Sequence, residues 1–167
     1  MSMVKKASNL LNRTEDVLAI IAGVLILFSM FSVILEVVTR YFWNISSIWV
    51  QEYNEYILLY IPFLAGAWLL RLNGHVAVDI INNFSGRKLT YVLNVIIAVI
   101  GIIVMVILVY YGTLATVDSF VRNVKSTSAL KTPQAYVYMI IPIGSFCLLL
   151  EFIRQLFTAS DVENESL

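Results

Sequence analysis

Three long stretches of the sequence carry no charged side chain, and a fourth stretch is nearly as long. The three stretches cover residues 17–35, 89–117 and 132–150, and the fourth covers residues 56–70. A helix needs about 20 apolar residues to cross a hydrocarbon core of about 30 Å, because each residue advances it by about 1.5 Å. The pattern therefore predicts an all-α membrane protein in which four transmembrane helices form a bundle.

Composition excludes the other broad classes of protein. Of the 167 residues, 60% are hydrophobic and only 13% are charged, whereas a soluble domain has about 25% charged residues. The formal net charge of zero argues against nucleic acid as a partner, since nucleic-acid-binding surfaces are strongly basic. We therefore expect a single integral membrane domain over residues 1–167.

Helix boundaries follow from the residues that flank the apolar stretches. The expected transmembrane helices cover about residues 16–40, 48–71, 88–115 and 133–157. Amphipathic helices that lie on the membrane surface are expected at about residues 3–15 and 74–85, where apolar side chains recur at helical spacing beside polar ones. Residues 160–167 are polar and acidic, and we expect this tail to be disordered.

Lysine and arginine residues predict the orientation of the chain. One predicted membrane face carries Lys5, Lys6, Arg13, Arg71, Arg87, Lys88 and Arg154. The opposite face carries Arg40, Arg122, Lys125 and Lys131. Cytoplasmic loops are enriched in positive residues, so the majority of seven against four predicts that both termini are cytoplasmic.

Charged side chains at the outer ends of the first two spans need an explanation, because charge within a membrane is costly. Glu36 and Arg40 lie four residues apart, and Glu52 and Glu55 lie three apart. The short connection predicts that Arg40 lies near one of the latter glutamates. The cluster is either a structural link between two helix ends or a docking surface for an extracytoplasmic partner. A coupling-ion site is expected nearer the midplane.

The outer loop before the fourth span adds two positive charges to this face. Lys125 and Lys131 are separated by small polar residues that are typical of a solvated loop. Two readings stay open for these lysines: they are solvated, or they contact the same extracytoplasmic partner.

A second group of polar residues follows the second span. Arg71 ends the span, and His75 and Asp79 then lie four residues apart on the expected surface helix, where they are able to form a hydrogen bond or ion pair. A zinc site needs four ligands, and the chain has one histidine and one cysteine. We therefore predict a structural contact here, and no catalytic, cofactor-binding or metal-binding residue in the chain.

Three segments of the sequence resemble a known transporter family. They are "RYFWNISSIWVQEYNEY", "FLAGAWLLRLNGHVAVDII" and "SALKTPQAYVYMIIPIG". Taken in this order with four spans, they are similar to the small, DctQ-like membrane subunit of tripartite ATP-independent periplasmic (TRAP) transporters. The matching positions are Arg40, Tyr41, Trp49, Glu52, Arg71, Gly74, His75, Asp79, Ser128, Leu130 and Pro133.

The resemblance implies that the chain lies in the bacterial inner membrane and catalyses no reaction itself. In this family a large multi-span subunit moves the substrate by an elevator motion that a sodium gradient drives. A periplasmic substrate-binding protein delivers an organic acid, such as a sialic acid or a C4-dicarboxylate. The small subunit braces the scaffold of the large subunit and helps to dock the receptor, with phospholipids in the seam. Sodium ions are expected in the large subunit, and no cofactor in this chain.

Two other functions remain compatible with four apolar helices. The chain would act as a stand-alone channel or exporter if it formed a homo-oligomer that transports by itself in liposomes. It would act as the membrane anchor of an enzyme complex if a cofactor that absorbs visible light copurified with it.

Overall fold

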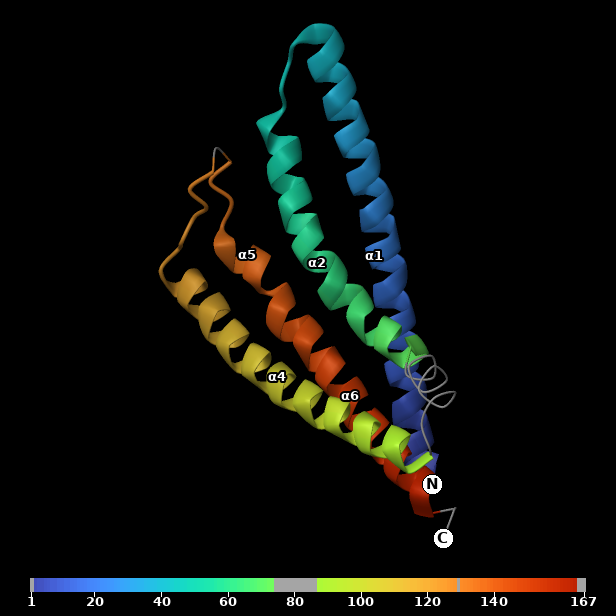
Figure 1. The fold of residues 1–167 in the computed structure, drawn as a ribbon. Coiled ribbons are helices and arrows are strands. Elements are labelled where there is room, and N and C mark those ends of the chain that lie inside the picture. Colours follow the sequence, from blue (N-terminus) through green and yellow to red (C-terminus); the bar gives the residue numbers. More distant parts are fainter. Residues whose placement is uncertain (1, 74–86, 129, 165–167) are drawn as a thin grey trace.

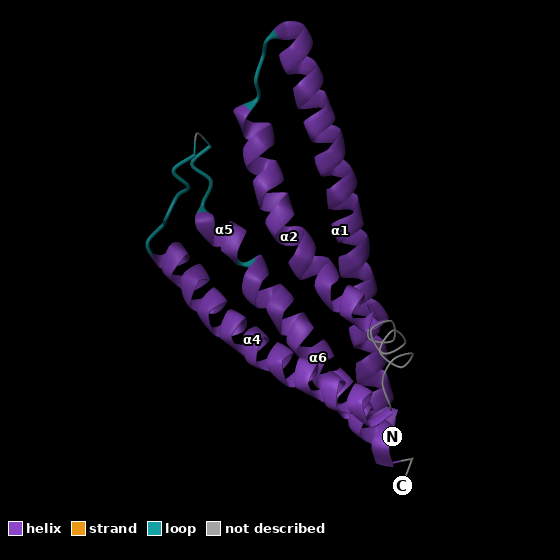
Figure 2. Cartoon of the chain, in the orientation of Figure 1, coloured by secondary structure: helices purple, strands orange, loops and turns teal. Residues whose placement is uncertain are grey.

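Helices make up nearly all of the computed structural model, which describes residues 2–73, 87–128 and 130–164. The helices are α1 (Ser2–Trp43), α2 (Ile48–Asn73), α4 (Arg87–Val121), α5 (Gln134–Tyr138) and α6 (Ile140–Asn164) (Figures 1 and 2). Four helical segments are long and apolar enough to span a membrane: Ser8–Trp43, Ile48–Leu72, Val92–Val121 and Gln134–Phe157. The predicted all-α membrane fold with four spans is confirmed.

The spans do not pack in their order along the chain. Helix α1 packs mainly against α2, α2 also packs against α6, and α6 packs against α4. The order in space is therefore α1, α2, α6 and α4, with α1 and α4 at the two edges (Figure 1). A small buried core of Ala22, Leu64 and Ile140 joins the first three of these helices.

Glycines let α6 and its two neighbours, α2 and α4, approach one another closely. A β-carbon at Gly144 of α6 would lie 2.7 Å from the carbonyl oxygen of Phe63 in α2. A β-carbon at Gly101 of α4 would lie 2.5 Å from the Phe152 ring in α6. Small residues are common where membrane helices meet, because they bring the two backbones together. The sequence thus sets the packing of α6 between α2 and α4.

The edge helices expose most of their apolar side chains. Examples on α1 are Leu27, Phe28 and Phe31, and examples on α4 are Ile103 and Ile107, all of them half exposed or more. A soluble monomer rarely exposes apolar surface on this scale. These faces therefore lie against lipid or against another membrane protein.

Helix α1 corrects the expected boundary between a surface helix at residues 3–15 and a separate first span. The structure has one continuous helix from Ser2 to Trp43. No glycine or proline interrupts residues 3–16, and the Thr14 hydroxyl donates back to the Leu10 carbonyl at 2.9 Å within the helix. The helix is therefore about 63 Å long at about 1.5 Å per residue, which exceeds the thickness of a bilayer.

The fourth span, expected over about residues 133–157, is interrupted close to its start. Helix α5 ends at Tyr138 and α6 begins at Ile140. Proline has no N–H to donate to the carbonyl four residues earlier, and for Pro142 that carbonyl belongs to Tyr138. The interruption therefore falls one turn before Pro142. Helix α6 then continues to Asn164, into the tail that was expected to be disordered from residue 160.

The expected surface helix at residues 74–85 lies outside the described residues. His75 and Asp79 belong to this segment, so their expected contact stays a prediction.

Candidate functional site

Polar side chains gather at the two ends of the helices. We call one end the loop end, because the 44–47 and 122–133 connections lie there (Figure 2). We call the other end the termini end, because both ends of the chain lie there (Figure 1). The charge-free stretches of the spans separate the two groups.

At the loop end, Glu52 of α2 anchors the long connection between α4 and α5. The Ser128 hydroxyl donates to Glu52 Oε2 at 2.9 Å, and the Leu130 N–H donates to Glu52 Oε1 at 3.4 Å. Glu52 is only 6% exposed, so its carboxylate faces the loop and not the solvent. The loop thereby gains a fixed attachment to α2, 76 residues earlier in the chain.

The anchored loop is held in a narrow hairpin. The Ser126 N–H donates to the Thr132 carbonyl at 2.8 Å, and the Gln134 N–H donates to the Val124 carbonyl at 3.0 Å. Lys131 has a positive φ of 49°, a conformation that costs a non-glycine residue about 1–2 kcal/mol. The hairpin and its Glu52 anchor hold the backbone in that conformation.

The other predicted residues at the loop end are arranged differently from the prediction. Arg40 forms a bidentate ion pair with Glu36 on its own helix. Among the described residues, neither Glu52 nor Glu55 lies within ion-pair distance of Arg40, because α1 continues past the start of α2 (Figure 1). Glu55 is exposed.

The loop end therefore presents both signs of charge to its surroundings. Arg40 is 59% exposed, and Lys125 and Lys131 are exposed on the hairpin. The structure keeps the predicted residues at one end of the molecule but divides them into an α1 pair, a buried anchor and exposed side chains. Such an exposed mixture of charges suits recognition of a soluble partner.

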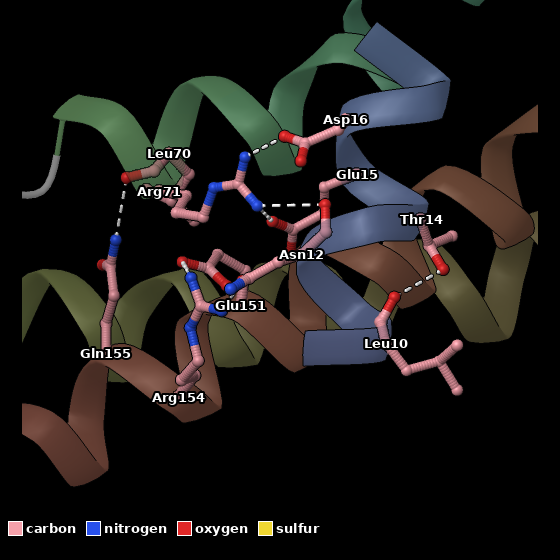
Figure 3. A network of polar contacts seen from close by, with 10 residues as sticks. All are labelled: Leu10, Asn12, Thr14, Glu15, Asp16, Leu70, Arg71, Glu151, Arg154 and Gln155. Carbon is pink, nitrogen blue, oxygen red and sulfur yellow. Dashed lines mark hydrogen bonds and ion pairs between the residues drawn. The ribbon is translucent and has the colours of Figure 1, made fainter. Parts of the chain in front are cut away.

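At the termini end, Arg71 of α2 binds the start of the first apolar stretch in α1. Its guanidinium lies 3.1 Å from Glu15 Oε2, pairs with Asp16, and donates to the Asn12 carbonyl at 3.1 Å (Figure 3). Arg71 was predicted as a site residue from its place at the end of the second span. Its partners lie more than 50 residues away in the sequence, so local spacing gave no sign of them.

Helix α6 completes this arrangement from the other side. Arg154 donates to Glu151 at 2.7 Å and also to the Asn12 side chain. Gln155 donates to the Leu70 carbonyl of α2 at 3.0 Å (Figure 3). We call these residues the termini-end network: Asn12, Glu15, Asp16, Leu70, Arg71, Glu151, Arg154 and Gln155. It joins α1, α2 and α6 by polar contacts.

Sequence reasoning missed Glu15, Asp16 and Glu151 as site residues. One signal was available, since Glu151 and Arg154 have the i,i+3 spacing of a helical ion pair next to an apolar stretch. The burial of these glutamates could not be predicted from the sequence, yet Glu15 is 0% exposed and Glu151 is 1% exposed.

The part of the chain that the structure describes contains no candidate metal site. No group of three or more His, Cys, Asp or Glu side chains there is placed to hold a metal ion. Cys147 is a free, half-buried thiol in α6.

Comparison with protein families gives one match. The chain matches the model of the DctQ component of tripartite ATP-independent periplasmic transporters over residues 29–161. A search of curated proteins returned no match. The matched region holds the loop-end residues from Glu36 to Lys131, as well as Arg71, Glu151 and Arg154 of the termini-end network. Since this match covers most of the sequence and the four-span fold agrees with it, the chain belongs to the DctQ family and is the small membrane subunit of a TRAP transporter.

Proposed function

We propose that this subunit braces the scaffold of the large transport subunit and carries no transport path or chemistry of its own. Family membership implies two partners, the large membrane subunit and a periplasmic binding protein. The observation that carries the proposal is the position of the charges. The described charged side chains of the spans lie near the ends, where several of them form ion pairs, while the central stretches carry none. Transporter ion sites lie near the midplane.

The transported substrate belongs to the large subunit and the receptor under this proposal. We propose sodium-coupled import of an organic acid, of the sialic acid or C4-dicarboxylate class. The sodium ions bind in the large subunit, and this chain needs no cofactor. The polar links at both ends of α2 support the scaffold role, because they fix the neighbouring elements to one another.

The exposed apolar faces of the edge helices are the proposed contact with the large subunit and with phospholipids in the seam. Phe28 and Phe31 of α1 and Ile103 and Ile107 of α4 are about half exposed. Without water as a competitor, such contacts are stabilised by close packing and not by a hydrophobic effect.

The loop end is the proposed docking surface for the periplasmic receptor. Exposed Arg40, Glu55, Lys125 and Lys131 supply charges for recognition, while Glu36 orients Arg40 and Glu52 fixes the hairpin. A rigid loop loses less conformational entropy on binding than a mobile one. Glu52 thus acts on docking through the hairpin and not by touching the receptor.

Replacing Glu52 with alanine is expected to weaken receptor-dependent uptake. The hairpin loses its two bonds to α2, and we expect about 1.4 kcal/mol less receptor affinity, which raises the receptor concentration at half-maximal uptake about tenfold. The measurement is sodium-driven uptake in proteoliposomes as the receptor is titrated. Asp118→Ala is the matched control, since Asp118 is an acid near the same end of the molecule that is 56% exposed and pairs with Arg122.

Two results would contradict this assignment of Glu52. One is an equal shift in both variants, which would show that the anchor has no special part in docking. The other is a changed sodium requirement in Glu52→Ala, which would place the residue in the coupling mechanism.

The proposed orientation, with the loop end in the periplasm, has a direct test by thiol labelling. A Thr127→Cys variant in a Cys147→Ser background is expected to react with a membrane-impermeant reagent in intact cells, because Thr127 is exposed on the hairpin. Arg13→Cys in the same background is exposed at the termini end and is expected to react only after lysis. The reverse pattern would invert the topology.

A further inference from the structure

Two carboxyl groups meet in the interior of the termini-end network. Glu15 belongs to α1 and Glu151 to α6, and their side chains lie at hydrogen-bonding distance from each other. Glu15 is 0% exposed and Glu151 is 1% exposed. Figure 3 shows them between the guanidinium groups of Arg71 and Arg154. Water is therefore excluded from the contact between the two acids.

Three of the four oxygens of this pair lack a hydrogen-bond donor in the described chain. No N–H or O–H in the described chain donates to either oxygen of Glu15, which forms an ion pair with Arg71 at 3.1 Å. Glu151 Oε1 accepts from Arg154, but Glu151 Oε2 accepts from no donor. Buried polar atoms are almost always hydrogen-bonded, and an ionised carboxylate accepts but does not donate. A donor is missing from the contact.

The cations around the pair also bind other acceptors. Three carboxyl groups, from Glu15, Asp16 and Glu151, face the guanidinium groups of Arg71 and Arg154. Cys147 lies one turn before Glu151 and adds no positive charge. Among the residues of α4 whose side chains the structure describes, the titratable ones, Tyr110, Tyr111 and Asp118, belong to its loop-end half. Arg71 also pairs with Asp16 and Arg154 also donates to Asn12, so both guanidinium groups are shared with acceptors outside the pair.

We infer that Glu15 and Glu151 bind one proton between them and that this proton links α1 to α6. A shared proton supplies the missing donor to the contact. Two adjacent carboxylates in a water-poor site cannot both be ionised at low cost, so such a pair titrates as a unit and holds a proton. The site lies at the end of the spans, so the proton has a structural role and lies off any transport path.

Infrared spectroscopy of the purified full-length chain tests this inference directly. We expect the wild-type protein at neutral pH to show the C=O stretch of one protonated carboxylic acid, which shifts in D₂O and on ¹³C labelling of glutamate. Glu15→Gln and Glu151→Gln are each expected to lose this band, because the remaining carboxyl group then ionises against its own arginine. Glu36→Gln is the matched control, since Glu36 is a buried glutamate paired with an arginine but without a second carboxyl group.

Three results would overturn the inference. The first is the absence of a protonated carboxyl band from the wild-type spectrum, as expected if a metal cation lay between the two acids. The second is a band that survives either Gln substitution. The third is a band that does not shift on ¹³C labelling of glutamate, and this result stands even if a variant fails to fold.

Discussion

Replacing Arg71 with methionine is expected to lower the free energy of unfolding by about 3–5 kcal/mol, the usual cost of removing one partner from a buried ion pair. Arg71 forms an ion pair with Glu15, which is fully buried. The substitution also removes the contacts with Asp16 and with the Asn12 carbonyl. Methionine keeps much of the arginine's apolar volume, so the loss reports the charge and its hydrogen bonds.

The measurement is reversible unfolding of the purified subunit in detergent, with Arg122→Met as the matched control. Arg122 also pairs with an acid, Asp118, but the two side chains are 72% and 56% exposed. Exposed pairs contribute about 0–1 kcal/mol, so the control is expected to unfold close to the wild type. Equal losses in the two variants would show that the termini-end network does not hold the three helices together.

Replacing Gly144 with alanine is expected to destabilise the fold by about 1–3 kcal/mol through overpacking. The new methyl group would lie 2.7 Å from the Phe63 carbonyl oxygen and 2.9 Å from the Phe63 α-carbon. Both are backbone atoms, so no rotation of a side chain relieves the contact. Helices α2 and α6 must separate, and the separation disturbs the centre of the helix packing.

Gly23→Ala is the matched control, because it makes the same chemical change at a position where we expect no loss of stability. A β-carbon at Gly23 of α1 would meet no atom within 4 Å, and alanine favours a helix over glycine by about 1 kcal/mol. The control is therefore expected to be as stable as the wild type or slightly more stable. Thermal unfolding in detergent compares the two variants, and a Gly144→Ala protein as stable as Gly23→Ala would contradict the close packing of α2 on α6.

The transmembrane architecture could be predicted from the sequence because it depends on one local property. A charge-free stretch of sufficient length has few stable solutions other than a membrane span, and the four predicted spans are present. Local sequence patterns predicted the ends of the helices less well than their presence. The polar residues before Val17 suggested a change of direction, but Arg71 binds Glu15 and Asp16 within a continuous α1.

Partners of the candidate site residues could not be predicted, because they depend on how distant segments pack. Arg71 and Glu52 were both identified from their positions at helix ends. Arg71 forms an ion pair with Glu15, and Glu52 accepts a hydrogen bond from Ser128, which lies in a hairpin 76 residues later. Arg40 was paired with the wrong glutamates, since the i,i+4 partner Glu36 is closer on its own helix.

Membership of the family could be predicted from short sequence segments alone. The resemblance carried by the segments around Arg40, Arg71 and Pro133 predicted the DctQ family, and the family match over residues 29–161 confirms it. The roles of the individual site residues stay predictions that the variants above are designed to test.

Reconstitution in proteoliposomes tests most directly the claim that this chain is a scaffold without a transport path. The measurement is uptake of a receptor-delivered organic acid under a sodium gradient, with the large subunit, the receptor and this chain added in all combinations. We predict uptake only when all three proteins are present, and none with this chain alone. Uptake by this chain alone, or full uptake by the large subunit and receptor without it, would contradict the scaffold account.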